Sequence, residues 1–203
     1  MEGEETRIYD ISQEVFGCNV FPGDPAPEKE ILSVISKDSP CNLSAFRMCA
    51  HNGTHVDAPY HFLQKGKTID QVELEKSIGN AYVTEHNGIM TAQDAAAIMG
   101  KARRIGRDFE KRILIKGKAV VSAEAADVFA EEGIFLLGNE SQTVGPEDAP
   151  MEVHLKLLGA EIVLLEGICL DKVPEGCYFL NAAPINLGGG DGAPCRAILV
   201  ELD

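Results

Sequence analysis

Three of the five histidines in this 203-residue chain fall within the eleven residues His51–His61, and an aspartate lies among them. His51, His55 and Asp57 offer imidazole nitrogens and a carboxylate, the ligands that zinc and manganese bind in proteins. The segment is a poor helix former, because glycine, threonine and valine disfavour helix interiors and Pro59 cannot continue one. The spacing therefore predicts a metal site on a bend and a strand. A solvated polar loop is the alternative.

Local backbone geometry can bring these ligands to one point. A bend at Gly53 lets the imidazoles of His51 and His55 converge. Side chains alternate along an extended chain, so an extended segment after the bend places His55 and Asp57 on the same side. His61 follows closely enough to face the metal without having to bind it.

A second group of ligand types lies much later in the chain. Glu166 ends the apolar run Ile162–Leu165, and a carboxylate buried by such neighbours is costly unless it is paired or bound to a metal. His154 lies on a predicted helix immediately before this strand, so the two side chains can meet. The pattern alone leaves open whether they are ligands. His86 stands beside Asn87 and Gly88, and we predict a surface turn there.

The His51–His61 segment resembles, position for position, the H-x-G-T-H-x-D-x-P-x-H signature of the putative cyclase family, which includes bacterial kynurenine formamidase and isatin hydrolase. Leu165–Ile168 resembles the family's L-E-G-L-like strand end, and Val173–Gly176 follows it as in the family. Asp191–Arg196 resembles the family's D-G-[S/A]-P-x-R element. The resemblance runs from Tyr9 nearly to the C-terminus.

The resemblance implies a metal centre and a role for each residue in it. The implied ligands are His51, His55, Asp57, His154 and Glu166. Asp57 and Glu166 would bridge two ions, whereas His61 would shuttle protons as the catalytic residue. The cofactor would be Zn²⁺ or Mn²⁺, with one or two ions per chain.

We expect metal-assisted hydrolysis of a carbon–nitrogen amide bond in a small molecule, as in kynurenine formamidase. A metal lowers the pKa of its bound water to about 7 and polarises the substrate carbonyl. The ordinary histidine pKa of about 6.5 suits His61 for moving protons. Two alternatives remain: a hydrolase that opens a lactone or cyclic amide, and a non-catalytic protein that binds metal or a small molecule. An intact His61 favours catalysis, since sequestration needs no additional histidine.

Two segments before and beside the signature bear on the site. Phe21–Pro25 resembles a WPGD-type loop that lies over the family's active site, with Phe21 where the formamidases have tryptophan. Phe21 is therefore a candidate substrate contact, and a plain turn with Phe21 in the core is the alternative. Cys49 lies two residues before His51 and could be a ligand or a redox switch, although packing is the role we expect.

Two later segments set limits on what can be predicted. Gly188–Gly192 has no Lys-Ser/Thr pair and leads into a strand, so it is not a phosphate-binding loop. A flexible hairpin is the alternative to the family element there. Asn139–Ser141 departs from the family's G-I-D-T-like turn, which puts any substrate contact at this turn in doubt.

The elements that must position these residues indicate one α/β domain spanning residues 1–203, with a mixed sheet and a few helices. The resemblance implies the swivelling β/β/α architecture of the cyclase family. Predicted strands are Thr6–Ile11, Glu30–Ser36, Leu43–Ala50, Ala81–Glu85, Arg112–Lys116, Ile134–Leu137, Ile162–Leu165, Tyr178–Ala183 and Cys195–Leu202. Predicted helices begin at Thr91 and stop at Gly100, run from a Ser122 cap through Glu132, and span Met151–Leu158; Gly66–Gly79 holds a short amphipathic piece.

Composition narrows the setting of this chemistry. The net charge of −14 argues against binding to nucleic acid or to an anionic membrane surface. Met1–Glu5 is acidic without an apolar core, so we predict no signal peptide. No apolar run reaches membrane-spanning length, and none of the six cysteines forms a C-x-x-C pair. We therefore expect a cytoplasmic enzyme, and the resemblance implies a homodimer or homotetramer in which the loop around Phe21 packs at a neighbour's site.

Overall fold

A nine-stranded mixed sheet forms the centre of the computed structural model, which describes residues 6–202. Its strand order is β1-β13-β11-β5-β7-β9-β10-β4-β12. The four adjacent strands β5, β7, β9 and β10 run parallel to one another. The strands are β1 (Ile8–Asp10), β4 (His55–Asp57), β5 (Ile78–Glu85), β7 (Arg112–Lys116), β9 (Leu136–Asn139), β10 (Val163–Glu166), β11 (Gly176–Asn181), β12 (Gly192–Pro194) and β13 (Ile198–Glu201).

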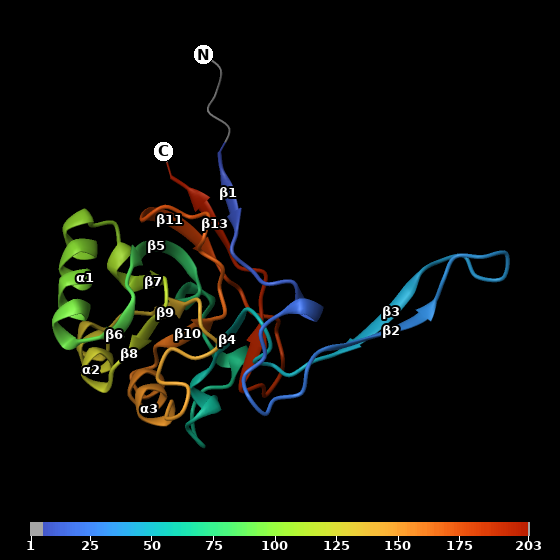
Figure 1. Ribbon diagram of the computed structural model, residues 1–203, viewed down its shortest axis with the longest axis horizontal. Coiled ribbons are helices and arrows are strands. Elements are labelled where there is room, and N and C mark those ends of the chain that lie inside the picture. The colour runs from blue at the N-terminus through green and yellow to red at the C-terminus, as the bar shows by residue number, and fades with distance from the viewer. Residues whose placement is uncertain (1–5, 203) are drawn as a thin grey trace, which may run out of the picture.

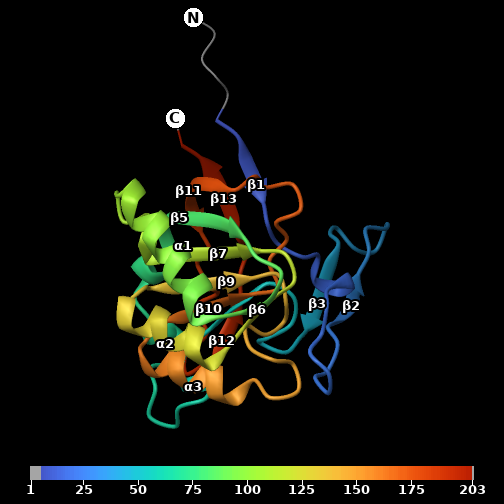
Figure 2. The same cartoon turned by 60° about the vertical axis from the view of Figure 1, so that its left-hand side comes forward.

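Three helices lie side by side against one face of this sheet, as Figures 1 and 2 show: α1 (Ala92–Ile105), α2 (Ala123–Glu132) and α3 (Met151–Gly159). Strand side chains alternate between the two faces. Ile113 and Ile115 of β7 pack toward the helices, whereas Leu114 packs in a second core on the other face. The predicted single α/β domain with a mixed sheet and few helices is confirmed.

The end of α1 differs from the prediction. Gly100 does not stop the helix, which continues to Ile105 and ends at Gly106 with a positive φ of 76°. A glycine inside a helix costs only about 1 kcal/mol relative to alanine, and burial of Ala102 on the next turn favours continuation. The predicted start is correct, because Thr91 caps the helix and pairs with Asp94 in a capping box.

The predicted C-terminal strand Cys195–Leu202 contains one shorter strand, β13, and a separate strand that was not predicted, β12, precedes it. β12 pairs with β4 at one end of the sheet, and β13 pairs with β1 and β11 near the other end. Pro194 has no backbone N–H to extend the ladder, so β12 ends there. The other predicted strands overlap observed ones with boundaries shifted by several residues at most. This arrangement leaves β4 between β10 and β12.

The other short elements lie outside the main sheet. β2 (Glu28–Ser33) and β3 (Leu43–Arg47) form an antiparallel hairpin that projects from the body, as Figure 1 shows. We call this hairpin, residues 28–47, the arm. β6 (Gly88–Met90) and β8 (Ala119–Val121) pair in parallel. Single 3₁₀ turns occupy Val15–Gly17, Pro59–His61, Ile69–Gln71, Leu74–Lys76 and Phe109–Lys111.

Two expectations concern the termini and the membrane. No helix within residues 6–202 is long and apolar enough to cross a bilayer. The prediction made for Met1–Glu5 lies outside the described residues.

Candidate metal centre

β4 places two of the predicted ligands on the helix-covered face of the sheet. Gly53 has a φ of 62°, which makes the bend before the strand. His55 and Asp57 are two residues apart on β4, so their side chains share a face. In the antiparallel register with β10, Glu166 lies directly opposite His55, which brings its carboxylate to the same face. Three ligand side chains thus follow from one strand pairing.

α3 adds a fourth side chain from above this face. His154 is buried, and its Nε2 lies 3.3 Å from Glu166 Oε1 and 3.7 Å from Asp57 Oδ2. His55 Nε2 lies 3.3 Å from Asp57 Oδ1 and 3.6 Å from Glu166 Oε2. We call these four residues, His55, Asp57, His154 and Glu166, the inner cluster. Each side chain is 3% exposed or less.

The two inner histidines are held by their other ring nitrogens. Nδ1 of His55 lies 3.0 Å from the Gly53 carbonyl, and Nδ1 of His154 lies 2.9 Å from the Pro150 carbonyl. A carbonyl can only accept, so Nδ1 carries a proton in both rings, and Nε2 is the nitrogen left to bind a metal ion. This backbone support is typical of metal-binding histidines.

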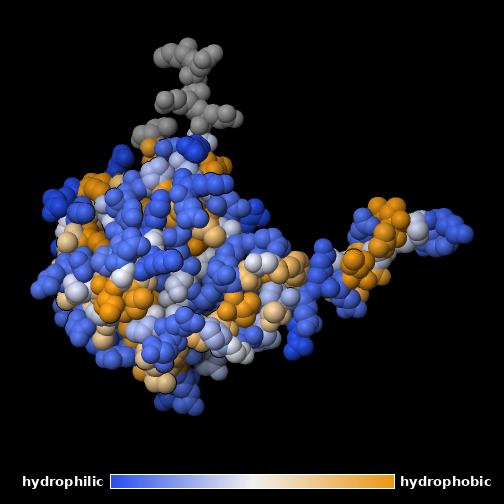
Figure 3. All heavy atoms as spheres, viewed as in Figure 1, coloured by the Kyte–Doolittle hydropathy of each residue, from blue (hydrophilic) through white to orange (hydrophobic). Residues whose placement is uncertain are grey.

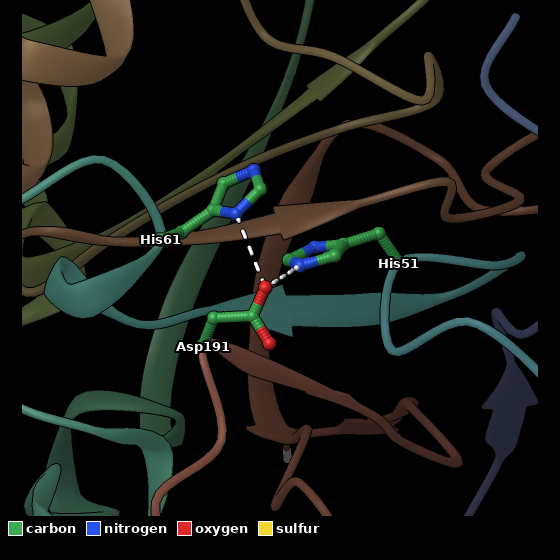
Figure 4. Close-up of side chains that lie close together, drawn as sticks. All are labelled: His51, His61 and Asp191. Atoms are coloured by element: carbon green, nitrogen blue, oxygen red, sulfur yellow. Dashed lines mark hydrogen bonds and ion pairs between the residues drawn. The ribbon is translucent and has the colours of Figure 1, made fainter. Parts of the chain in front are cut away.

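Three further side chains lie nearer the surface. His51 Nδ1 is 2.8 Å from Asp57 Oδ1, and His51 Nε2 is 2.9 Å from Asp191 Oδ2. The ring of His61 stacks on that of His51 at 4.0 Å between centroids, and its Nδ1 is 3.5 Å from the same Asp191 oxygen (Figure 4). We call His51, His61 and Asp191 the outer cluster. Their side chains are 12%, 27% and 46% exposed.

Opposed charges shift the pKa values of the outer cluster. Burial alone would lower the pKa of His51, but hydrogen bonds with Asp191 and Asp57 outweigh it and raise the pKa to about 11. The hydrogen bond with His51 lowers the pKa of Asp191 to about 2. Burial lowers the pKa of His61, which favours its neutral ring.

Two buried carboxylates dominate the inner cluster. Burial and the neighbouring Asp57 charge raise the pKa of Glu166. Burial would also raise the pKa of Asp57, but hydrogen bonds with His51 and His55 hold it well below its usual value. One carboxylate is therefore firmly ionised next to a second one that is costly to ionise, an arrangement that a cation would relieve.

The chemistry of the inner cluster fits a divalent metal ion. His55 Nε2 and Asp57 Oδ2 are buried and have no hydrogen-bond partner. Unsatisfied buried polar atoms are rare in proteins and call for an explanation. Ligand atoms gather within 4.8 Å of one another in three groups: His51 with His55 and Asp57, Asp57 with His154 and Glu166, and His51 with His61 and Asp191. Asp57 belongs to two of them.

A cavity of about 380 Å³ opens onto both clusters. Phe21 and Asp24 line it, as predicted for a loop over the site, and so does Cys49. The thiol of Cys49 lies 3.7 Å from Asp24 Oδ2 and belongs to none of the candidate metal groups among the described residues. The interpretation of Cys49 as a ligand therefore gains no support from the geometry.

The structure brings together all six residues that the sequence proposed for metal and proton transfer. The remaining candidate, Phe21, lies on the cavity wall. His86 is half-buried between β5 and β6 and belongs to no candidate metal group within residues 6–202. In the divergent turn, Glu140 accepts hydrogen bonds from the backbones of Gly117 and Leu170, so its carboxylate ties loops together.

Asp191 is the functional candidate that the sequence did not single out. Its only signal was the resemblance of Asp191–Arg196 to the D-G-[S/A]-P-x-R element, which assigns no role to the aspartate. The strand β12 that follows it pairs with β4, and this pairing carries Asp191 to the ligands.

Comparisons with known proteins agree with this geometry. Residues 9–146 match the family described as "Putative cyclase". The chain is 33% identical to kynurenine formamidase of Erythrobacter litoralis over 98% of this chain and 95% of that protein. It is also 33% identical to kynurenine formamidase of Paracidovorax citrulli, with 95% of each chain covered.

Solved structures share the whole fold. A potential metal-dependent hydrolase with cyclase activity superposes with a TM-score of 0.81 and 26% identity, covering 98% of this chain and all of that one. Isatin hydrolase A from Labrenzia aggregata superposes with a TM-score of 0.83 over 98% and 94% of the chains, and at 21% identity it speaks for the fold alone. The chain belongs to the putative cyclase family, and it is a hydrolytic enzyme.

Proposed function

We propose that this hydrolase cleaves a carbon–nitrogen amide bond of a small molecule with a divalent metal held by its inner cluster, as a kynurenine formamidase does. The observation that carries the proposal is the buried set His55, Asp57, His154 and Glu166, three of which (His55, His154 and Glu166) line the cavity. The curated relatives named kynurenine formamidase support an aryl formamide as substrate.

The inner cluster and His51 would hold the ion or ions, and the donor set of imidazoles and carboxylates suits zinc or manganese. When bound, the metal supplies a Lewis acid and an activated water. We propose two ions, because Asp57 faces two ligand groups and can serve both. Glu166 lies within reach of His55 and His154, so its two oxygens can serve the same pair.

His61 is the proposed proton shuttle. It faces the cavity, stacks on His51 and is absent from both groups that contain Asp57. Its burial favours the neutral ring, which can accept a proton from the attacking water and return it to the leaving amine. Phe21 forms a wall of the same cavity and would pack against the apolar part of the substrate.

The test joins metal analysis to a hydrolysis screen. Purified protein is loaded separately with zinc and manganese, analysed for bound metal, and assayed on N-formyl aryl amides, cyclic amides and lactones, with and without a chelator. We expect bound metal and chelator-sensitive formamide hydrolysis. If only lactones or cyclic amides were turned over, the substrate class would be a lactone or cyclic amide in place of an aryl formamide. Absence of stoichiometric zinc or manganese would refute the metal-dependent proposal.

We also propose that the chain forms a homodimer or homotetramer through the arm. A two-stranded hairpin alone is marginally stable in water, yet the arm projects from the body with apolar side chains on its surface (Figures 1 and 3). Its residues 28–47 contain three acidic and three basic side chains, so the arm is neutral in a chain of charge −14. The exposed apolar residues are Ile31, Leu32, Val34, Ile35, Leu43 and Phe46.

A second copy of the chain suits this surface, because the neutral arm meets no net repulsion from an acidic body. Light scattering at micromolar concentration should give the mass of a dimer or tetramer. The double variant Ile31→Asp with Ile35→Asp should lower that mass, whereas Ile89→Asp, on an equally exposed isoleucine of the body, should not. A monomeric wild type would contradict the proposal.

The cytoplasm is the proposed location. The six cysteines Cys18, Cys41, Cys49, Cys169, Cys177 and Cys195 are all free thiols. Free thiols are typical of proteins kept in a reducing compartment. Fractionation of cells that produce the native protein, with a periplasmic marker as control, tests this assignment.

A further inference from the structure

The glycine-rich loop before β12 closes over the ring of His51. Asp191 ends the loop, and its Oδ2 lies 2.9 Å from His51 Nε2. Gly192 follows and has no side chain where the ring lies, since a Cβ there would be 2.8 Å from His51 Cε1 and 2.9 Å from the Val56 carbonyl oxygen. The loop therefore contacts the His51 ring at two places: the Asp191 carboxylate meets Nε2, and the backbone of Gly192 packs beside Cε1.

The loop is itself fixed to the segment that follows β4. The Ala58 N–H donates to the Asp191 carbonyl at 3.0 Å, and the Ile69 N–H donates to the Gly190 carbonyl at 2.8 Å. The Gly189 N–H donates to the Asp70 carboxylate at 2.9 Å. These bonds fix the backbone that carries Asp191 and so hold its carboxylate within reach of His51.

The ring nitrogens of His51 have two different partners. Nδ1 faces the inner cluster, 2.8 Å from Asp57 Oδ1, and Nε2 faces Asp191 on the opposite side of the ring. In a ring that binds metal through Nδ1, Nε2 carries the proton and can donate it to Asp191. His55 and His154 have backbone carbonyls in the corresponding place. Of these three histidines that face the metal site, His51 is the one whose second ring nitrogen is hydrogen-bonded to a carboxylate.

We infer that Asp191 is a positioning residue that orients His51 as a metal ligand and strengthens its bond to the ion, an inference that rests on the proposed metal centre. The distances favour His51 over His61 as the partner, because the same oxygen is 2.9 Å from the first and 3.5 Å from the second (Figure 4). A carboxylate behind a ligating histidine raises the basicity of the ring and fixes its tautomer.

The test compares Asp191→Asn with wild type by chelator competition for Zn²⁺ and by the visible spectrum of the Co²⁺-loaded protein. Loss of such a supporting carboxylate weakens metal affinity by about 10–100-fold. We expect that loss for one ion, with the Co²⁺ spectrum at saturation close to that of wild type. Asp10→Asn is the matched control, because Asp10 is 44% exposed, pairs with Arg196 and lies on a different surface hollow.

A double variant separates a contact with His51 from other effects. In the His51→Ala background, Asp191→Asn should change metal affinity no further, since the supported ring is gone. An additive effect would overturn the inference. So would unchanged affinity in Asp191→Asn, with either a raised KM, which indicates substrate contact, or a lowered kcat, which indicates action through His61. A changed Co²⁺ spectrum at saturation would make Asp191 itself a ligand. Wild type without metal would refute the proposed function instead.

Discussion

The inner and outer clusters contain the same chemical groups, imidazole and carboxylate, in opposite surroundings. The inner residues stand on β4, β10 and α3 and are almost fully buried, with two polar atoms unpaired. The outer residues stand on the loops before β4 and β12 and on a 3₁₀ turn, are partly exposed, and satisfy one another. The difference indicates that the inner cluster is built to hold cations, whereas the outer cluster adds His51 as a ligand on the cavity side and places His61 where it can move protons.

Asp57→Asn should have the largest effect, because Asp57 is the inner-cluster residue that belongs to two candidate metal groups and also contacts His51. Both ions should be lost, and since Lewis-acid catalysis contributes several kcal/mol, turnover should fall by about 10³-fold or more. Metal analysis and turnover on an aryl formamide measure this, with circular dichroism as a check on folding. A folded variant that kept both ions would show that Asp57 is not a ligand shared by the two ions.

The second prediction distinguishes inner-cluster residues that serve one ion from those that serve two. His154→Ala should lower the metal stoichiometry from about two toward one, because His154 belongs to one candidate group only. Glu166→Gln should be more harmful, since loss of a bridging carboxylate leaves two cations close together. His86→Ala is the control and should change nothing. A wild type with one ion, or a His154→Ala variant with two, would leave a one-metal hydrolase based on His51, His55 and Asp57.

The third prediction separates the role of His61 from metal binding. His61→Ala should retain its metal, because His61 belongs to neither group that contains Asp57. Turnover should still fall by about 10²-fold or more, the usual contribution of a general acid–base residue. Elemental analysis and steady-state kinetics on the same sample measure both quantities. Loss of metal from this variant would show that His61 is a ligand and not a proton shuttle.

The sequence predicted the inner cluster in two steps of different strength. Local alternation was enough to place His55 and Asp57 on one face, since both lie on one strand. The meeting of Glu166 with His55 depends on the register between β10 and β4, which pairs residues more than a hundred positions apart. No local pattern specifies such a pairing, so family resemblance was needed to propose His154 and Glu166 as ligands.

The outer cluster was predicted less completely for a physical reason. His51 and His61 belong to one short segment, whereas Asp191 joins them through the pairing of β12 with β4. A three-residue strand that begins with glycine and ends with proline has almost no strand pattern. The same weakness explains why β12 was not predicted as a strand, and why the loop before it could not be given a role.

Phe21→Ala should have the smallest effect and should sharpen the division between holding metal and admitting substrate. Phe21 is half-buried on the cavity wall and belongs to neither cluster, so its removal should leave metal content unchanged. Loss of part of an apolar contact costs about 1.4 kcal/mol, so KM for an aryl formamide should rise about tenfold with little change in kcat. Phe16→Ala is the matched control, because Phe16 packs edge-on against Phe46 away from the cavity. A lowered kcat with unchanged KM in Phe21→Ala would mean that this wall orders the reacting groups, and that the outer surface of the site takes part in the chemical step.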